Sequence, residues 1–416
     1  MKTVAIVGFG SRGQMFGKLA AKIENVKLVA VAEPLEVNRD RAIELGLTQE
    51  NIFLNADEFF AQGKICDAVF ICTQDKDHCR QALEALELGY DICLEKPAAT
   101  TVEDCILIRD TAKRLGRKVM LTHVLRYTPF YGYIKKLIVS GKLGEIVHID
   151  QTENIAYWHF SLSFVRGPWR DMTESTPTVI AKCCHDLDII KWLMDKKCTD
   201  VSSYGSLHYY NEAHAPEGSA AHCADCRKDV REKCVYNAYT VYPERISRGV
   251  VGGTARLRGQ SVEDILNERK DPISKCVFRS DNDAVDTQVV NMRFADGATA
   301  HLTMTAFSRE CHRRVHVYGT HGEVFGDMDD HTLTVNIFGE STQTVDINKL
   351  VEDEKVNLKG GHGGGDYFLF KDFLDYITED SENFTRTTIE DSIESHVIGF
   401  KAEESRRSDG RSIKIS

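Results

Sequence analysis

The 416-residue sequence has few prolines, few tryptophans and no excess of positive charge. It contains 8 prolines and 3 tryptophans, which excludes proline-rich and collagen-like classes of protein. Its 52 lysines and arginines are outnumbered by 63 aspartates and glutamates, and the formal net charge of -11 opposes binding to a nucleic-acid backbone. Hydrophobic residues at 42% and charged residues at 28% are typical of globular proteins. We therefore expect a small molecule, and no nucleic acid, as the binding partner.

Long apolar runs are also lacking. The first residues, Met1–Val7, enter a strand pattern directly, and the apolar stretch is too short for a signal peptide or a membrane span. We expect a cytoplasmic protein that makes no membrane contact. In that reducing compartment the 13 cysteines are expected to stay free thiols, apart from one cluster with the spacing of metal ligands.

The first part of the chain alternates short β-rich runs with segments of helical period, a pattern that predicts βαβ units on a parallel sheet. The expected strands are Val4–Val7, Leu28–Ala32, Ala68–Cys72, Ile92–Leu94 and Val119–Leu121. A helix capped by Thr101, with Gly116 just past its end, is expected between the last two. Residues 1–123 are therefore predicted to form an α/β Rossmann domain.

After Pro129 the pattern changes to strands joined by tight turns, best seen around Asp296-Gly297. The expected strands are Val289–Phe294, Thr299–Thr305, Arg314–Tyr318, Glu323–Asp327 and Thr332–Phe338. We predict that residues 124–416 form an α+β domain with a large, mostly antiparallel open sheet and helices on one face. Residues 211–285 are polar, aperiodic and Cys-bearing, and are interpreted as an insertion or long loop.

A glycine-rich segment joins the first expected strand to the first expected helix. Gly8 allows a tight turn, Gly10 lets the backbone approach a pyrophosphate, and Gly13 lets helix and strand pack closely. The other residues of this expected cofactor loop are Phe9, Ser11 and Arg12. Free N–H groups at the helix start would hold the phosphates. An ordinary turn is the alternative, but a strand, a helix and a carboxylate at the expected distance accompany the pattern.

That carboxylate is Glu33, about 20 residues past Gly13 at the end of the second expected strand, where it can hydrogen-bond ribose hydroxyls. Its negative charge would repel a 2′-phosphate. NAD is therefore favoured over NADP, with Arg39 as the argument for NADP. A solvated helix cap is the alternative role for Glu33.

Further cofactor contacts are expected where other strands end at the carboxyl edge of the sheet, at Thr73, Glu95 and Lys96. Pro97 fixes the exit of the chain, which would hold Glu95 and Lys96 in place. Lys96 beside an oxidised nicotinamide could polarise a substrate hydroxyl or relay its proton, so we treat it as a catalytic candidate. The alternative is a surface salt bridge.

These motifs together resemble one family. The glycine loop, Glu95-Lys96-Pro97, Gly144-Glu145-Ile146 and His185-Asp186-Leu187-Asp188 look like the glucose–fructose oxidoreductase, inositol dehydrogenase and rhizopine catabolism (Gfo/Idh/MocA) family. The resemblance covers nearly the whole chain. It implies a Rossmann domain, a second domain whose open sheet face makes homodimer or homotetramer contacts, and hydride exchange between a sugar or polyol carbon and a nicotinamide.

His185 is the candidate general acid/base of the second domain, because an imidazole titrates near neutrality and hydride removal from an alcohol requires a proton acceptor. His185 and Asp188 fall three residues apart on one face of an expected helix. Many relatives carry an aspartate four residues before this histidine, whereas this chain has Ala181. Lys182, Asp186 or another residue would have to substitute, so the identity of the base stays open.

Aromatic residues with polar heads occur in two runs that suit a carbohydrate site, since rings stack on sugar C–H faces while polar groups read hydroxyls. The candidate substrate contacts are Tyr157, His159, Arg166, Trp169, Lys182, Asp186 and His362. An aromatic core with capping arginines is the alternative for the first four. His362 and Asp366 belong to a glycine-rich loop, at residues 361–366, that borders the active site in the family.

Cys223, Cys226 and Cys234 have spacings that resemble part of a structural zinc site, which needs four ligands. The fourth could be His214, His222 or Cys276, and the alternative is free cysteines in a loop.

The sequence is compatible with three functions. The first is an NAD-dependent dehydrogenase of a sugar, sugar acid, glycoside or cyclitol, with Lys96 and His185 in proton transfer. The second is a glycoside-cleaving enzyme that uses held NAD for transient oxidation and elimination. The third is a non-catalytic NAD-binding sensor on a retained fold.

Overall fold

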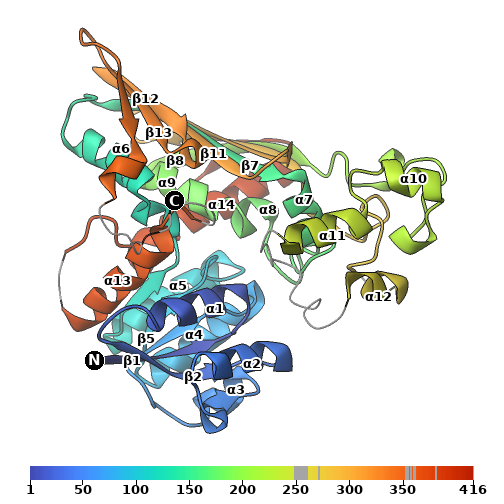
Figure 1. Ribbon diagram of the computed structural model, residues 1–416. Helices are drawn as coiled ribbons and strands as arrows, with labels where there is room; N and C mark the ends of the chain where they lie inside the picture. Colours follow the sequence, from blue (N-terminus) through green and yellow to red (C-terminus); the bar gives the residue numbers. More distant parts are fainter. Residues whose placement is uncertain are drawn as a thin grey trace.

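The structure is a computed structural model that describes residues 1–247, 261–269, 272–351, 356, 358, 362–379 and 382–415. Figure 1 shows an N-terminal α/β domain, a second domain built on a large sheet, and a group of short helices projecting from the side of the second domain. Gly361 of the predicted glycine-rich loop, and residues 248–260 and 270–271 of the predicted insertion, lie outside the described residues.

The N-terminal sheet has six parallel strands in the order β3-β2-β1-β4-β5-β6. They are β1 (Lys2–Val7), β2 (Val26–Ala32), β3 (Ile52–Phe53), β4 (Ala68–Ile71), β5 (Asp91–Leu94) and β6 (Val119–Leu121). This confirms the predicted Rossmann sheet. The strand order reverses direction between β1 and β4, and ligands of such sheets bind in the crevice outside the carboxyl ends of these strands.

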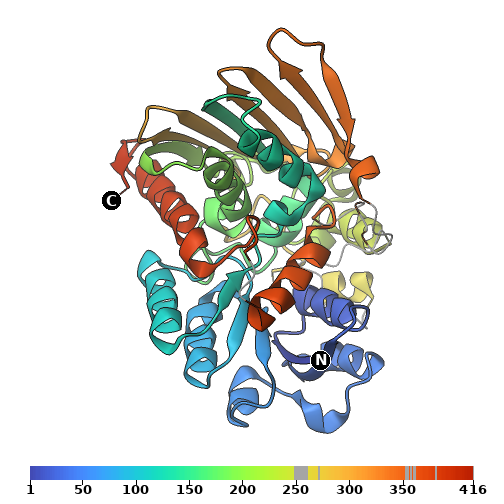
Figure 2. The ribbon, with the colours of Figure 1, turned by 90° about the vertical axis from the view of Figure 1, so that its left-hand side faces the viewer.

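Helices cover both faces of this sheet (Figure 2). They are α1 (Ser11–Ala20), α2 (Glu36–Glu44), α3 (Ala56–Phe60), α4 (His78–Glu87) and α5 (Val102–Leu115), with short 3₁₀ turns at Gln49–Asn51 and Asp75–Asp77. The Thr101 side chain accepts a hydrogen bond from the backbone N–H of Asp104, and Gly116 ends α5 with a left-handed φ of 62°. The predicted start and end of this helix are therefore confirmed.

The second sheet has nine strands in the order β14-β13-β12-β11-β7-β10-β9-β8-β15. They are β7 (Ile146–Ala156), β8 (Cys198–Ser206), β9 (Thr287–Phe294), β10 (Thr299–Ser308), β11 (His312–Gly319), β12 (Gly322–Asp327), β13 (Thr332–Ile337), β14 (Gln343–Asp346) and β15 (Ile413–Lys414). Neighbouring strands are antiparallel except for β7 and β10, which are parallel. The predicted, mostly antiparallel sheet is confirmed.

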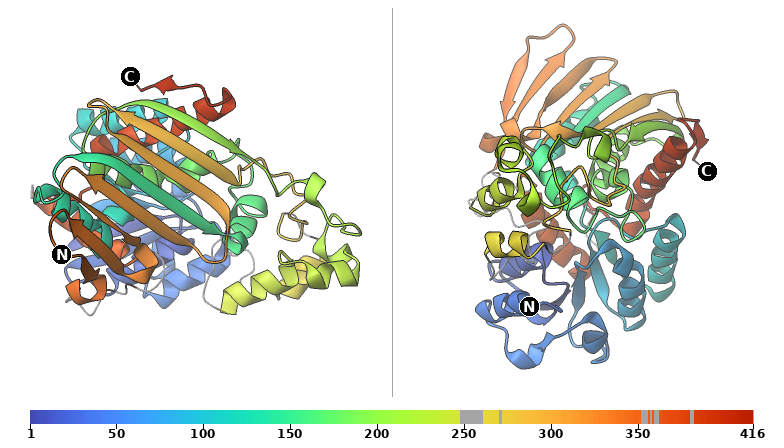
Figure 3. Two further views of the ribbon diagram at one scale, coloured as in Figure 1. Left: turned by 90° about the horizontal axis from the view of Figure 1, so that it is seen from above. Right: turned by 90° about the vertical axis from the view of Figure 1, so that its right-hand side faces the viewer.

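Helices pack on one face of this second sheet, and the other face is open in the view from above (Figure 3). The helices are α6 (Pro129–Val139), α7 (Tyr157–Phe160), α8 (Thr178–Ala181), α9 (Cys184–Met194) and α14 (Ile389–Arg407), with short turns at η3 (Val124–Tyr127), η4 (Ser161–Val165), η8 (Met328–Asp330) and η9 (Ile347–Leu350). Helix α13 (Gly365–Thr378) packs instead on the Rossmann sheet. Alternation along β10 buries Leu302 and Met304 and leaves His301 and Thr303 partly exposed. Polar side chains therefore lie on the uncovered face.

The C-terminal helices complete the core of the Rossmann domain, which the sequence did not predict. On α13, the rings of Phe370 and Phe373 lie 5.0 and 5.1 Å from the ring of Phe70 on β4. The backbone N–H of Leu121 on β6 donates to the carbonyl of Thr387, just before α14, at 2.8 Å. Residues far apart in sequence thus share one hydrophobic core.

The projecting helices come from the predicted insertion. They are η5 (Glu212–His214), η6 (Cys223–Asp225), α10 (Lys228–Lys233), α11 (Ala238–Ser247) and α12 (Val262–Asn267). A small separate core joins Val241, Tyr242 and Leu266 of these helices to Trp158 and Leu162. The insertion is therefore anchored on the segment that follows β7. No helix in the described residues has the length and apolar character needed to cross a membrane.

Candidate functional site

The glycine loop between β1 and α1 has the geometry expected of a pyrophosphate cradle. A Cβ at Gly8, whose φ is +87°, would lie 2.6 Å from the carbonyl oxygen of Cys72, and a Cβ at Gly13 would lie 2.2 Å from the carbonyl oxygen of Gly8. Both positions therefore exclude larger residues by close packing. At Gly10, by contrast, an added Cβ would meet no atom within 4 Å. Open space lies above Gly10, where a cofactor phosphate could approach the backbone.

Helix α1 begins directly behind this space. Gly10 is its N-cap residue, and no side chain caps the first turn. The N–H groups of a helix start are left without intrahelical partners and attract anions. The loop thus fits the phosphates of a dinucleotide.

Glu33 follows β2 and is buried, with 4% of its surface exposed. Its two carboxylate oxygens accept hydrogen bonds from the backbone N–H groups of Phe9, at 2.8 Å, and Leu35, at 2.9 Å. The carboxylate therefore lies beside the glycine loop, where it could also accept ribose hydroxyls. The guanidinium of Arg39 donates to the carbonyl oxygens of Glu33 and Pro34.

Arg12 links the glycine loop to the second domain. Its guanidinium pairs with Glu95 after β5 and, at 2.8 Å, with Asp366 at the start of α13. Burial alone would raise the pKa of the Asp366 carboxyl, but Arg12 and His362 outweigh that effect and hold this pKa below its usual range. The charged end of Arg12 is thus committed to two carboxylates. The contact of Arg12 with a cofactor stays a prediction.

Thr73 and Lys96 lie at the carboxyl ends of β4 and β5. The Thr73 hydroxyl donates to Gln81 at 2.7 Å. The backbone N–H of Lys96 donates to Thr122 after β6, and the peptide between Lys96 and Pro97 is cis. The ammonium of Lys96 crosses to the second domain and donates to the carbonyl oxygen of Ala181, at the end of α8, at 2.8 Å. The residue that replaces the family's aspartate therefore meets the candidate catalytic lysine through its backbone.

Three histidines converge next to this lysine. The ring centroid of His185 on α9 lies 5.5 Å from that of His362 and 5.8 Å from that of His123. His185 is 4% exposed, and its Nδ1 has no hydrogen-bond partner. Burial first, then the charge of Lys96 and the neighbouring rings, lowers the pKa of His185 well below its ordinary value. The unprotonated form of His185 is therefore favoured, and its Nδ1 is free to form a hydrogen bond with a bound molecule.

His123 was missed by the sequence reasoning. It lies between β6 and η3, is fully buried, and neither ring nitrogen has a hydrogen-bond partner. Burial is the main cause that lowers its pKa to about 3. No periodicity or motif distinguishes this position, because it falls in the short connection that leaves the Rossmann sheet.

Asp188 does not pair with His185, although both lie on α9. Its carboxylate forms two hydrogen bonds, of 2.6 and 2.7 Å, with the guanidinium of Arg126 on η3, and both side chains are almost completely buried. Removing either partner would leave a buried charge uncompensated. The pair therefore fixes α9, and with it His185, against the connection from the Rossmann domain.

Charged side chains of the second domain form a buried network of ion pairs. Lys182 lies 3.3 Å from Glu153 on β7, and Arg313 on β11 pairs with both Glu153 and Asp186. Burial outweighs Arg313 and raises the pKa of Asp186 to about 6. Asp186 also accepts a hydrogen bond from Gln151 and has no exposed surface. Both contacts involve Oδ1, and Oδ2 is buried without a hydrogen-bond partner, so the substrate contact of Asp186 stays a prediction.

Arg313 was not among the predicted site residues, although a signal for it existed. Alternation along β11 places it on the same face as Val315 and Val317, which is the buried face of the sheet. A charged residue at an inward position requires a buried partner and marks a site.

The aromatic runs divide between the site and the fold. His159 on α7 lies near Lys182 and Arg313, and burial is the first cause that lowers its pKa to about 3, followed by those cations. Tyr157 packs against Tyr236 of the insertion, at a ring distance of 5.9 Å.

Arg166 and Trp169 are committed elsewhere. Arg166 is 1% exposed and donates to the carbonyl oxygens of Lys275 and Tyr236, so its guanidinium anchors the insertion. Its contact with a substrate stays a prediction. The indole N–H of Trp169 donates to Asp75, in the 3₁₀ turn that follows β4 of the Rossmann domain, at 3.3 Å. Trp169 therefore connects the two domains beside Thr73.

The predicted zinc site receives no support. No group of three or more His, Cys, Asp or Glu side chains within the described ranges is arranged to hold a metal ion. Cys223, Cys226 and Cys234 line a cavity together with Cys276. The candidate histidine ligands have other partners: His214 hydrogen-bonds Asn211, and His222 hydrogen-bonds Ser274.

Two family models match the chain. Residues 2–123 match the model described as "Oxidoreductase family, NAD-binding Rossmann fold", and residues 135–415 match "Oxidoreductase family, C-terminal alpha/beta domain". The two matches together cover both sheets and the candidate site between them.

Curated relatives share between a quarter and a third of their aligned residues with this chain. The putative oxidoreductase YteT of Bacillus subtilis is 28% identical over 74% of this chain and 72% of its own length. The scyllo-inositol 2-dehydrogenase (NAD(+)) of Bacillus subtilis is 27% identical over 49% of this chain and 57% of its own length. An alpha-N-acetylgalactosaminidase of Bacteroides fragilis is 31% identical, but only over 36% of this chain and 37% of its own length.

Solved structures share the whole fold. An inositol dehydrogenase homolog from Azotobacter vinelandii, complexed with NAD+, superposes with a TM-score of 0.71 at 16% identity, over 100% of this chain and 97% of the other.

Proposed function

Because the chain belongs to the Gfo/Idh/MocA oxidoreductase family, we propose that it is an NAD-dependent enzyme acting on a secondary hydroxyl of a sugar, sugar acid, glycoside or cyclitol. One observation carries the proposal. Lys96 follows β5 beside the open glycine loop and bonds α8 of the second domain, close to the buried imidazole of His185. Groups for holding a cofactor and for moving a proton therefore lie near one another.

The bound nicotinamide supplies hydride acceptance and return. The chain's own residues do the rest in this proposal: the N–H groups around Gly10 hold the phosphates, and Glu33 holds the ribose and disfavours a 2′-phosphate. Lys96 polarises the substrate hydroxyl through its ammonium, and His185 takes the hydroxyl proton at a ring nitrogen. Lys182 and Arg313, held by Glu153, orient the remaining hydroxyls.

The test is a panel of sugars, sugar acids and polyols incubated with NAD and followed by NADH absorbance. Lys96→Ala and His185→Ala should each lower kcat by about 10²–10⁴-fold while the Kd for NAD stays within about threefold of wild type. Lys113→Ala, at an exposed position of α5, is the matched control and should leave both quantities unchanged. Unaltered turnover in Lys96→Ala would remove this residue from the mechanism.

A second candidate is cleavage of a glycoside by transient oxidation, elimination and re-reduction on held NAD. Two observations favour it: the partial relative is named an alpha-N-acetylgalactosaminidase, and Ala181 supplies only a backbone carbonyl where relatives carry a relay aspartate. Release of nitrophenol from aryl glycosides without net NADH formation, by protein that retains NAD in native mass spectrometry, would select this candidate. Steady NADH formation from free polyols with no glycoside cleavage would eliminate it.

We also propose that the open face of the nine-stranded sheet joins copies of the chain into a dimer or tetramer. The uncovered face of this sheet in Figure 3 supports the assignment. Light scattering on wild type and on His301→Glu, a substitution in the middle of that face, tests it, since a charge repeated across an interface would dissociate the oligomer.

A further inference from the structure

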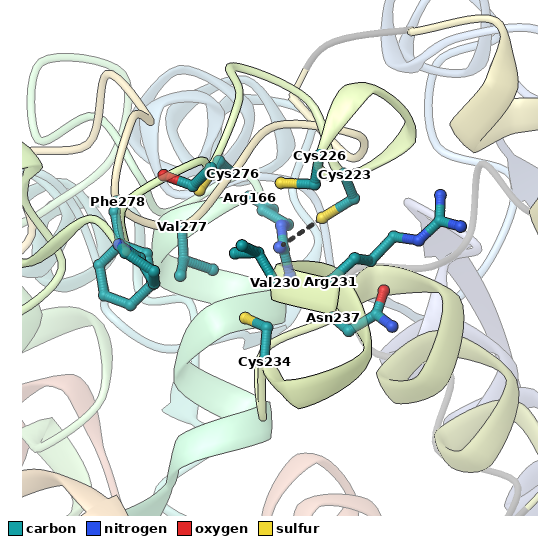
Figure 4. A pocket seen from close by; sticks show the side chains of 12 residues that line it. Arg166, Cys223, Cys226, Val230, Arg231, Cys234, Asn237, Cys276, Val277 and Phe278 are labelled. Atoms are coloured by element: carbon teal, nitrogen blue, oxygen red, sulfur yellow. Dashed lines mark hydrogen bonds between the residues drawn. The ribbon is translucent and has the colours of Figure 1, made fainter. Parts of the chain in front are cut away.

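The insertion encloses a small cavity lined by four cysteines, away from the proposed active site. Figure 4 shows Cys223, Cys226, Cys234 and Cys276 around it, with the guanidinium of Arg166 pointing into it. Its volume of about 20 Å³ is close to the minimum that holds one water molecule. All four cysteines are free thiols. The proposed oxidoreductase reaction uses none of them.

Two of these thiols are already placed for pairing with each other. Cys223 and Cys226 are the first and fourth residues of a turn at η6, closed by a hydrogen bond of 3.4 Å from the Cys226 N–H to the Cys223 carbonyl. The ends of such a turn lie less than about 7 Å apart between Cα atoms. A disulfide spans Cα separations of about 4.4–6.8 Å, a range that overlaps the span of such a turn.

Arg166 supplies a cation beside the first thiol. Its Nη2 lies 3.5 Å from the Cys223 sulfur, and its remaining partners are backbone carbonyl oxygens, while Nη1 is buried without a partner. No carboxylate in the described ranges pairs with this buried guanidinium. Buried charges require compensation. Among the described residues, the side-chain hydrogen-bond partner of this guanidinium is the Cys223 sulfur.

The second thiol differs in access. Cys226 is partly exposed, whereas Cys223 is buried, and the Cys226 sulfur accepts a hydrogen bond from the backbone N–H of Ala220 at 3.3 Å. A small reagent can therefore reach Cys226 first, with Cys223 directly behind it.

We propose that Cys223 and Cys226 form a thiol–disulfide exchange site, in which the two thiols donate two electrons to a low-molecular-weight disulfide. The Cys226 sulfur attacks the disulfide, forms a mixed disulfide, and releases one small thiol. The Cys223 sulfur then attacks the Cys226 sulfur and releases the second small thiol. The two protons lost by the cysteines pass to the two released thiols. The protein dithiol is oxidised by two electrons and the small disulfide is reduced by two.

The test uses the whole 416-residue chain, incubated with excess glutathione disulfide, alkylated in acid and mapped by non-reducing peptide mass spectrometry. We expect two of the 13 thiols to be lost and a single Cys223–Cys226 bridge to appear. Cys223→Ser should instead accumulate one glutathione on Cys226, because the resolving thiol is absent. Cys79→Ser, at a partly exposed cysteine of α4, is the matched control and should behave as wild type.

Three results would overturn the proposal: both thiols remaining free, a bridge between other cysteines, or one tightly held metal ion per chain with all four thiols protected from alkylation. The wild-type peptide map decides among these even if Cys223→Ser fails to fold. Failure of this proposal would leave the proposed oxidoreductase function untouched, because the NADH assay tests the roles of Lys96 and His185 and involves none of these cysteines.

Discussion

Alanine substitutions at Gly10 and Gly13 can distinguish an effect on NAD binding from an effect on the free energy of unfolding, because each adds one methyl group in a different environment. A Cβ at Gly10 meets no protein atom within 4 Å, and the φ of -70° suits alanine. Gly10→Ala should therefore cost less than about 1 kcal/mol of the free energy of unfolding, the size of a helix-cap effect. A Cβ at Gly13 meets the carbonyl oxygen of Gly8 at 2.2 Å. Gly13→Ala should cost at least about 1–3 kcal/mol, the range for overpacking.

Although Gly10→Ala should change the stability little, it should weaken NAD binding strongly. Its added methyl group would occupy the space where a phosphate has to approach the backbone, and one hydrogen bond to a charged group contributes about 1.5–3 kcal/mol. The Kd for NAD of Gly10→Ala should therefore rise about 10- to 100-fold. Titration calorimetry with NAD gives the Kd, and urea denaturation of the apoprotein gives the stability. Wild-type affinity in a stably folded Gly10→Ala would refute the assignment of this loop to the pyrophosphate.

Three further predictions follow from buried charges and ionisable groups. Arg126→Met should lower the free energy of unfolding by about 3–5 kcal/mol, and the double variant with Asp188→Leu should recover part of that loss; urea denaturation of both checks whether the pair is a buried ion pair. Burial lowers the pKa of His123 from 6.5 to about 3. Between these two pH values the unfolded chain is protonated at His123, whereas the folded chain is not. This stabilisation is complete above pH 6.5 and should fall by up to about 1.4 kcal/mol per pH unit towards pH 3, and a His123→Leu variant with an unchanged acid limb would contradict it. Glu33→Ser, which leaves Arg39 in place, should shift the ratio of the Kd values for NAD and NADP towards NADP by at least about tenfold, measured by fluorescence titration of the reduced cofactors.

The fold could be predicted from the sequence wherever a local pattern determines the element. The five longer Rossmann strands and the cap of α5 at Thr101 are set by hydrophobic period and capping chemistry within a few residues. Strand β3 escaped detection because Ile52–Phe53 is too short to show a period. The packing of α13 on β4 was not predicted either, because the sequence of residues 365–378 does not indicate which apolar surface this helix covers.

The site was predictable to the extent that motifs encode backbone geometry. The roles of Gly8 and Gly13 follow from close contacts that only glycine permits, and the position of Glu33 follows from the length of one βα unit. The partners of charged side chains were not predictable. Arg12, Arg166 and Asp186 were all expected to face ligands, and each is held by groups that lie far away in sequence.

The contact of α13 and α14 with the Rossmann core also determines when this core can be completed during synthesis. Residues 1–123 are synthesised before Phe370, Phe373 and the strand partner at Thr387, which follow β7–β14 of the second sheet in the chain. Until then the nascent Rossmann sheet lacks part of its apolar cover, and such surface is prone to aggregation. Truncation of this chain before α13, which removes both α13 and α14, should therefore abolish soluble expression of the remaining residues.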